Sequence, residues 1–308
     1  MTSHKHVESV GFIGLGSMGI GLATNLLKMV QQNNGIMHVH NRTAAKADPL
    51  LKQGAKWASS PANIGQQCSI TFSCVFSDTA LREVFTAYLS GHPRQESLYI
   101  DCSTVSPDTI RELDAKAKAA GLTFICAPVF GRPPAAMEGQ VLWAPAGPAH
   151  ALDRLQPYLD AMGRGTMRIG NEAYMASVMK LCGNFFIASV IETTAEGMTL
   201  AEKNGVSRET VLEFISSTFP GQLYPMYAEK IARNHFHLSP EVPGARVEGG
   251  LKDVGLIQSL ATECGVQMPL GKLMLDHLKE AGDCGWTDLD WTAVTRVIRE
   301  PAGIHRED

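Results

Sequence analysis

VGFIGLGSMG, residues 10–19, is the strongest indication of fold in the N-terminal half of this chain. Its first four residues form an apolar β-type run, and the glycines after them have the spacing G-x-G-x-x-G. The following IGLATNLLK has the apolar periodicity of a helix. In a strand–turn–helix unit, such glycines allow a tight turn, close approach of a pyrophosphate to the backbone, and close packing of helix on strand. We therefore predict a dinucleotide-binding unit whose cofactor-binding residues are Gly14, Leu15, Gly16, Ser17, Met18 and Gly19.

Short β-type runs alternate with helical patterns through the first half of the chain. The β-type runs are Val10–Ile13, Ile36–His40, Ser69–Val75, Leu98–Cys102, Thr123–Ala127 and Val141–Ala144. The helical patterns that separate several of them are Met18–Lys28, Thr79–Leu89 and Pro107–Ala120. Strands that alternate with helices predict βαβ units and a parallel sheet.

The pattern changes in the second half, where β-type runs stop and long helical patterns take over. The glycine-rich stretch Met162–Gly170 marks the expected boundary, because its three glycines interrupt both patterns. We predict an α/β Rossmann domain over residues 1–170 and an all-α domain over residues 171–308, linked by a long interdomain helix.

The predicted linking helix runs from Ala173 to Lys203, a span without proline and with apolar residues on nearly every face. At 1.5 Å per residue it would be about 45 Å long. Lys180 and Asn184 lie within its apolar part. Both would be costly inside a bilayer, so we interpret the segment as a buried helix and not as a membrane span.

Composition argues against several classes of protein. The net charge is -4 and the pI is near 6.2, which predicts no surface for nucleic acid or an anionic membrane. The seven cysteines are scattered without a C-x-x-C pair, and no histidine lies at metal-ligand spacing, so we expect reduced thiols and no metal. The N-terminal MTSHKHVES is polar and carries no targeting signal, which predicts a disordered lead-in and a cytoplasmic protein.

The residues after the second predicted strand indicate which dinucleotide is bound. An NAD site would place an acidic residue here to hold the ribose 2′-hydroxyl. This chain instead has Asn41, Arg42 and Thr43, with Lys46 one turn later. A guanidinium, a hydroxyl and an ammonium suit a ribose 2′-phosphate, so we predict a preference for NADP(H) over NAD(H). The alternative is that these are solvated loop residues.

With these motifs the chain resembles the β-hydroxyacid dehydrogenase family, of 3-hydroxyisobutyrate dehydrogenase and glyoxylate/succinic semialdehyde reductase type, related to 6-phosphogluconate dehydrogenase. Besides the glycine motif and NRTAAK, the matching elements in chain order are Cys74-Val75-Phe76, Asp101-Cys102-Ser103-Thr104-Val105-Ser106-Pro107, the Lys180-x-x-x-Asn184 pair, Lys252-Asp253 and Asp290-Trp291-Thr292-Ala293. The resemblance implies a Rossmann domain, an all-α domain, an active site in the interdomain cleft, and a homodimer or homotetramer.

The resemblance also assigns site residues. It places Ser103 and Thr104 beside the nicotinamide, with Ser103 also contacting substrate, and Val75 and Phe76 against the cofactor ribose. It implies that Lys252 contacts substrate and cofactor.

Lys180 and Asn184 are the expected catalytic residues. Reducing a carbonyl requires a hydride on carbon and a proton on oxygen, so the site needs a general acid near the nicotinamide. Lys180 can donate that proton, and in the reverse direction a neutral lysine can accept one. Asn184 lies one helical turn later on the same face and can hold substrate or the lysine.

The substrate loop departs from the family pattern P-V-S-G-G. Phe130 stands where the family has a serine that helps to hold a substrate carboxylate, Gly131 is kept, and Arg132 replaces a glycine. Either Arg132 supplies a replacement carboxylate anchor, or Phe130 makes an apolar pocket for a larger carbonyl or imine. Both alternatives stay open on the sequence.

Three functions are compatible with these residues. The first is an NADP(H)-dependent oxidoreductase acting on a small semialdehyde or 3-hydroxy acid. The second is an NADPH-dependent imine reductase, although members of that related family typically carry Asp or Tyr at the place of Lys180. The third is a non-catalytic NADP-binding protein.

Overall fold

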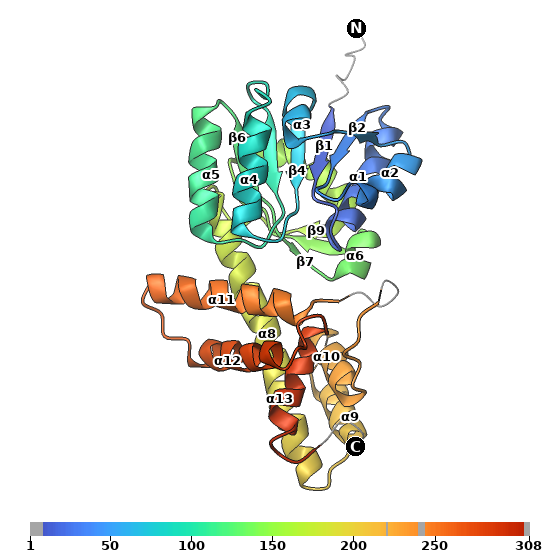
Figure 1. Cartoon of the computed structure of the whole chain (residues 1–308), viewed down its shortest axis with the longest axis vertical. Coiled ribbons are helices and arrows are strands. Elements are labelled where there is room, and N and C mark those ends of the chain that lie inside the picture. Colours follow the sequence, from blue (N-terminus) through green and yellow to red (C-terminus); the bar gives the residue numbers. More distant parts are fainter. Residues whose placement is uncertain (1–8, 220, 240–243, 305–308) are drawn as a thin grey trace. The chain divides into compact units, whose positions relative to one another are not determined.

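The computed structural model describes residues 9–219, 221–239 and 244–304. The chain divides into two compact units, Met1–Lys180 and Leu181–Asp308. The division lies inside one long helix, α8 (Tyr174–Lys203), which is labelled in Figure 1.

The first unit is built on a six-stranded parallel sheet with the order β3-β2-β1-β4-β5-β6. Its strands are β1 (Val10–Ile13), β2 (Met37–His40), β3 (Lys56–Trp57), β4 (Ile70–Ser73), β5 (Leu98–Asp101) and β6 (Thr123–Cys126). This is the strand order of a Rossmann domain, so the predicted fold class is confirmed. The edge strand β3 was not predicted, because two exposed residues give no periodic signal.

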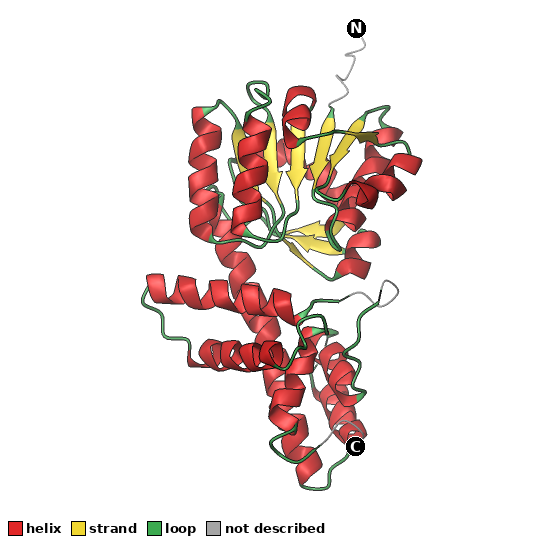
Figure 2. Cartoon of the chain, viewed as in Figure 1, coloured by secondary structure: helices red, strands yellow, loops and turns green. Residues whose placement is uncertain are grey.

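Alternate strand residues face two separate apolar cores. Phe12 and Ile100 belong to one core, whereas their chain neighbours Ile13 and Tyr99 belong to the other. Helices cover the sheet on both sides (Figure 2). They are α1 (Gly19–Gln32), α2 (Asp48–Lys52) after a short 3₁₀ turn η1 (Ala44–Ala47), α3 (Pro61–Gln67), α4 (Asp78–Leu89), α5 (Pro107–Ala119), α6 (Pro133–Met137) and α7 (Ala149–Met162). Strands β1, β4 and β5 are buried along their whole length because helices cover both faces of the sheet there.

A second, three-stranded sheet completes the first unit. It has the order β7-β8-β9, with β7 at Val129–Phe130, β8 at Val141–Trp143 and β9 at Gly163–Thr166. The glycine-rich stretch that we expected to mark the domain boundary therefore contains a strand. A Cβ on Gly163 would lie 2.6 Å from the Trp143 ring, so this glycine permits close packing of β9 against β8.

The second unit is helical, as predicted. It contains most of α8 (Tyr174–Lys203), then α9 (Arg208–Thr218), α10 (Leu223–Ala232), α11 (Val247–Glu263), α12 (Pro269–Asp283), the 3₁₀ turn η2 (Trp291–Val294) and α13 (Thr295–Arg299). Helix α8 is long and apolar enough to cross a membrane by length and composition. Its buried Leu181, Ile191 and Ala195 belong to the core of this unit, which agrees with the predicted buried helix.

Asp290 of the closing D-W-T-A motif has a structural role in the second unit. Its carboxylate is fully buried and accepts hydrogen bonds from the Thr292 backbone N–H and hydroxyl. The Lys230 ammonium of α10 lies 2.6 Å from its other oxygen. These contacts fasten η2 to α10. Removing either Asp290 or Lys230 would leave the other as an uncompensated buried charge.

Candidate functional site

The glycine turn after β1 has the three properties that a dinucleotide requires. Gly14 has φ +96°, and a Cβ there would lie 2.2 Å from the Cys74 carbonyl oxygen, so the tight turn excludes any side chain. A Cβ on Gly19 would lie 2.0 Å from the Gly14 carbonyl oxygen, where α1 packs onto the turn. Gly16 is exposed, and a Cβ there would meet no protein atom within 4 Å. Packing therefore explains Gly14 and Gly19 but not Gly16, whose bare backbone suits a ligand phosphate.

The loop after β2 is joined directly to this turn. Asn41 Oδ1 accepts a hydrogen bond of 2.8 Å from the Leu15 backbone N–H, and Asn41 Nδ2 donates one of 2.9 Å to the Thr43 carbonyl. The Oδ1 contact joins the two loops, and the Nδ2 contact fixes the backbone of the loop after β2. Arg42, Thr43 and Lys46 are exposed on the loop that this amide fixes. Gly16 and the α1 N-terminus together fit the phosphates of a dinucleotide, and the basic groups lie on the adjoining loop.

A buried carboxylate organises the ends of β4 and β5. Asp101 Oδ1 accepts hydrogen bonds from the hydroxyls of Ser73 (2.9 Å) and Ser103 (2.7 Å). The Ser103 hydroxyl oxygen in turn accepts a 2.9 Å hydrogen bond from the Val75 backbone N–H. Burial raises the pKa of Asp101 to about 6, although the hydrogen bonds from Ser103 and Ser73 oppose that rise. Asp101 and Ser103 thus set the start of the loop that carries Val75 and the exposed Phe76.

A second carboxylate holds the other end of the same loop. Asp78 accepts hydrogen bonds from the Ser106 backbone N–H (2.9 Å) and hydroxyl (2.6 Å), and from the Thr109 hydroxyl. Burial alone would raise the pKa of Asp78, but these hydrogen bonds lower it below its ordinary value. The segments that contain Phe76 and the half-buried Thr104 are therefore tied together at both ends.

Lys180 is held near the start of α8 and beside the second sheet. Ser177, almost one turn earlier on α8, donates a hydrogen bond to the Val105 carbonyl and so links the helix to the segment after β5. The Lys180 ammonium lies 4.6 Å from the centroid of the Phe130 ring at the end of β7. The structure thus brings Lys180 and Phe130 together, which the sequence did not predict.

The loop after Phe130 has a constrained backbone. Gly131 has φ +152°, and a Cβ there would lie 3.0 Å from a methyl carbon of Val141. Arg132 is half-buried and immediately precedes α6, whose first turn contains Pro133 and Pro134. The conformation and packing at Gly131 explain why glycine is kept there while its neighbours depart from the family pattern.

In the second unit, Asp253 contacts both Asn184 and Lys252, which were predicted as site residues. Asn184 is 6% exposed, and its amide donates a 2.7 Å hydrogen bond to Asp253 Oδ2. The Lys252 ammonium lies 2.9 Å from Asp253 Oδ1. We did not select Asp253 from the sequence, although its place beside Lys252 in the K-D element was the available signal.

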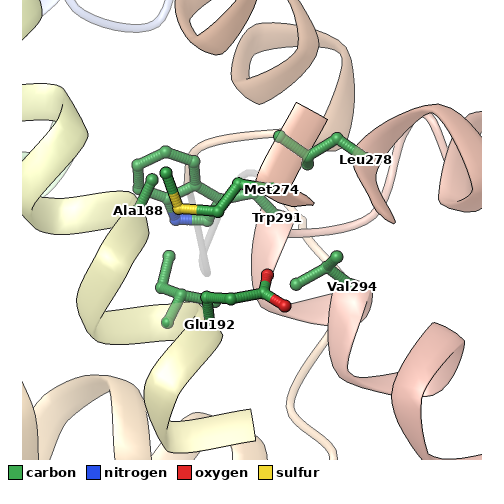
Figure 3. A pocket seen from close by; sticks show the side chains of 7 residues that line it. Ala188, Glu192, Met274, Leu278, Trp291 and Val294 are labelled. Atoms are coloured by element: carbon green, nitrogen blue, oxygen red, sulfur yellow. The ribbon is translucent and has the colours of Figure 1, made fainter. Parts of the chain in front are cut away.

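A pocket in the second unit contains none of the predicted site residues. Figure 3 shows Glu192 of α8 facing Met274 and Trp291 across it. Glu192 is 2% exposed, and His277 Nδ1 lies 2.5 Å from its carboxylate. Burial raises the pKa of Glu192, and the neighbouring His277 opposes the rise. Over residues 9–219, 221–239 and 244–304, no group of three or more His, Cys, Asp or Glu side chains could hold a metal ion.

Comparison with known proteins now identifies the family. Residues 9–174 match the model of the NAD binding domain of 6-phosphogluconate dehydrogenase. Residues 175–298 match the model described as NAD-binding of NADP-dependent 3-hydroxyisobutyrate dehydrogenase. The chain belongs to the β-hydroxyacid dehydrogenase family. It is accordingly an oxidoreductase with NAD(P)-binding domains.

Relatives in this family match over most of the chain. Glyoxylate/succinic semialdehyde reductase 1 of Arabidopsis thaliana is 30% identical over 94% of this chain and 98% of that protein. Cytokine-like nuclear factor N-PAC of Danio rerio is 32% identical over 94% of this chain, which spans only 62% of that protein's length. The structure of 3-hydroxyisobutyrate dehydrogenase of Mycobacterium tuberculosis with L-serine superimposes with a TM-score of 0.83 at 25% identity, over 95% of this chain and 99% of that one.

Imine reductases also share the fold of this chain, with lower structural similarity than the Mycobacterium dehydrogenase. Their solved structures superimpose with TM-scores of 0.60 to 0.62 at 18–21% identity. This similarity extends to the fold alone.

The buried Asp101 carboxylate makes a testable contribution to the pH dependence of stability. Its folded-state pKa of about 6 lies above the ordinary value of 3.8, so its favourable contribution is complete below that ordinary value. The contribution is lost as pH rises through about 6. We expect the wild type to lose on the order of 3 kcal/mol of unfolding free energy relative to Asp101→Asn between about pH 4 and about pH 7.

Urea unfolding followed by circular dichroism at several pH values measures this difference. Asp288→Asn, at an exposed carboxylate, is the matched control and should differ from wild type by a constant amount. A constant difference for Asp101→Asn as well would contradict the account of the buried network.

Proposed function

We propose that this protein is an NADP(H)-dependent oxidoreductase of a small carbonyl or hydroxy compound, most specifically a semialdehyde or a 3-hydroxy acid. The observation that carries the proposal is the placement of Lys180. Its ammonium lies at the end of β7, on a helix that Ser177 ties to the segment after β5. The names of the Arabidopsis reductase and the Mycobacterium dehydrogenase support this class of substrate.

NADP(H) is the cofactor that the residues support. The loop that Asn41 joins to the glycine turn exposes Arg42, Thr43 and Lys46, and it carries no acidic residue to bind a free ribose 2′-hydroxyl. The model that matches residues 175–298 is described from an NADP-dependent enzyme, which also supports this choice.

The proposed chemistry divides between cofactor and protein. Bound NADPH supplies a hydride to the carbonyl carbon. Lys180 holds a proton at its ammonium and donates it to the carbonyl oxygen; in the oxidation direction its neutral amine accepts the hydroxyl proton. Asn184, held by Asp253, orients the substrate, and we assign Lys252, Ser103 and the Gly131–Arg132 backbone to binding. Ser103 acts mainly by fixing Val75, because its hydroxyl already joins Asp101 to that backbone.

Reduction of an imine is the second candidate function. It is favoured by Phe130, which puts an aromatic ring and not a hydroxyl beside Lys180. It is disfavoured by Lys180 itself, because a protonated imine needs no proton from an ammonium. A non-catalytic NADP-binding protein is the third candidate, and it would bind cofactor without turnover. For all three we propose a soluble, cytoplasmic homodimer or homotetramer with a small-molecule ligand.

Replacement of Lys180 tests the proposed function. Lys180→Ala should keep cofactor binding and lower kcat by about 10²-fold or more, because it removes the general acid. The measurement is NADPH consumption with short semialdehydes, 2-oxo acids and cyclic imines, together with NADP-dependent oxidation of hydroxy acids. Lys203→Ala, at an exposed lysine at the end of the same helix, should retain wild-type activity. Near wild-type turnover by Lys180→Ala with the best substrate would refute the assignment.

Replacement of Arg42 tests the cofactor preference. The wild type should prefer NADP(H) over NAD(H) by at least about tenfold, since the phosphate contacts together are worth about 1.4 kcal/mol or more. Arg42→Ala should raise KM for NADP(H) much more than KM for NAD(H). Lys52→Ala, at an exposed lysine on α2, should change neither the KM for NADP(H) nor the KM for NAD(H). Equal kcat/KM for both cofactors in the wild type would exclude the preference.

A further inference from the structure

The Lys180 ammonium contacts the ring of Phe130, a residue that has no part in the proposed proton transfer. The ammonium lies 4.6 Å from the ring centroid, inside the range of about 6 Å within which a ring face attracts a cation. Phe130 is half-buried, at the end of β7. A side chain in this position can act on the lysine without itself exchanging a proton.

The backbone that carries the ring is fixed on both sides. On one side, β7 pairs with β8, and Phe130 lies opposite Leu142 in that ladder. On the other side, Gly131 packs against Val141 in a conformation that favours glycine, and the two prolines of α6 follow. The ring therefore extends from a rigid segment, which is the condition for positioning another group.

The lysine is also fixed at its base. The Ser177 hydroxyl donates to the Val105 carbonyl, so the turn of α8 before Lys180 is fastened to the segment after β5. The long side chain of a lysine still has several rotatable bonds beyond that point. A contact at its ammonium is what restricts those bonds, and Phe130 provides one.

From this geometry we propose that Phe130 is a positioning and specificity residue: its ring holds the Lys180 ammonium in place and favours substrates that are uncharged next to the reacting carbonyl. The proposal rests on the proposed role of Lys180. A ring face attracts the positive charge through its quadrupole, more weakly than a carboxylate at the same distance would in an ion pair. The ammonium is thus oriented and remains able to donate.

The same ring restricts the substrate. Its face is negative and apolar, so a carboxylate directly beside it would lose hydration and gain no hydrogen bond. A carbonyl whose neighbouring carbon carries a hydrogen or an alkyl group would instead gain apolar contact. The expected substrate therefore has its carboxylate, if any, separated from the carbonyl by intervening carbon atoms, as in a semialdehyde and unlike glyoxylate.

Two substitutions separate the effect of the aromatic ring face from the effect of side-chain volume. Phe130→Leu keeps an apolar side chain and removes the ring face, and it should lower kcat about threefold to tenfold with KM for NADPH unchanged. Phe130→Tyr keeps the ring and should restore kcat to within about twofold of wild type. A residue that only fills space would not give this pattern, because leucine preserves most of the packing.

Phe130→Ser tests specificity on a matched series of short aldehydes with and without an adjacent carboxylate. It should raise kcat/KM for glyoxylate relative to the carboxylate-free aldehydes by about tenfold, as expected for one hydrogen bond to a charged group. Unchanged ratios in Phe130→Ser, or wild-type kcat in Phe130→Leu, would overturn the proposal. If Lys180→Ala is active as well, the proposed function fails; if Lys180→Ala is inactive, only the role of Phe130 fails.

Pentafluorophenylalanine at position 130 keeps the shape of the ring and reverses its quadrupole, so it covers the case in which leucine disturbs folding. The expected result is the loss of kcat seen for Phe130→Leu, with an unchanged melting temperature. Full activity of the fluorinated protein would show that the ring acts by packing alone and would overturn the proposal.

Discussion

The backbone of Gly14 approaches the Cys74 carbonyl closely at the edge of the sheet where the candidate cofactor residues lie. This approach is possible only without a side chain at position 14, and it brings the ends of β1 and β4 together under the N-terminus of α1. Parallel strands end at the same edge of a sheet, so every loop that follows β1, β2, β4 and β5 opens at that edge. The candidate cofactor residues of the first unit all lie on these loops or on the turn itself.

Buried polar groups then fix these loops relative to one another. Asn41 joins the glycine turn to the basic loop, Asp101 and Ser103 set the loop after β4, and Asp78 connects that loop to α5. The protein's own side chains and backbone make all three links. They hold the loops in one arrangement, as a binding site requires of its supporting groups.

The sequence predicted the features that depend on local pattern. The glycine spacing, the apolar strands and the proline-free helix from Ala173 all identified elements that the structure contains. The strands could be recognised because burial on both faces of a sheet leaves a continuous apolar run. The short strands β3, β7 and β9 were not predicted. Strands β3 and β7 have only two residues each, and β9 has the sequence GRGT, which contains no apolar run. The glycines of β9 were interpreted as a domain boundary, whereas the structure shows that Gly163 leaves room for the Trp143 ring.

Side-chain partners were harder to predict than residue types. Lys180 and Asn184 could be selected by spacing, but the contacts of Phe130 with Lys180 and of Asp253 with Asn184 join residues that are distant in the chain. Such pairs depend on tertiary packing and leave no periodic trace. The resemblance to a family supplied Ser103 as a site residue, and only the structure showed that its hydroxyl fixes Val75.

We propose that the glycine turn holds the phosphates of NADPH, and a substitution of Gly16 probes that contact. A valine there would meet no protein atom at its Cβ, so Gly16→Val should fold with wild-type stability, yet its side chain would occupy the space proposed for the pyrophosphate. The measurement is isothermal titration of NADPH into both proteins. We expect NADPH binding to weaken at least about a hundredfold, or about 3 kcal/mol, at an unchanged melting temperature. Wild-type affinity in a correctly folded Gly16→Val would rule out phosphate binding at this turn.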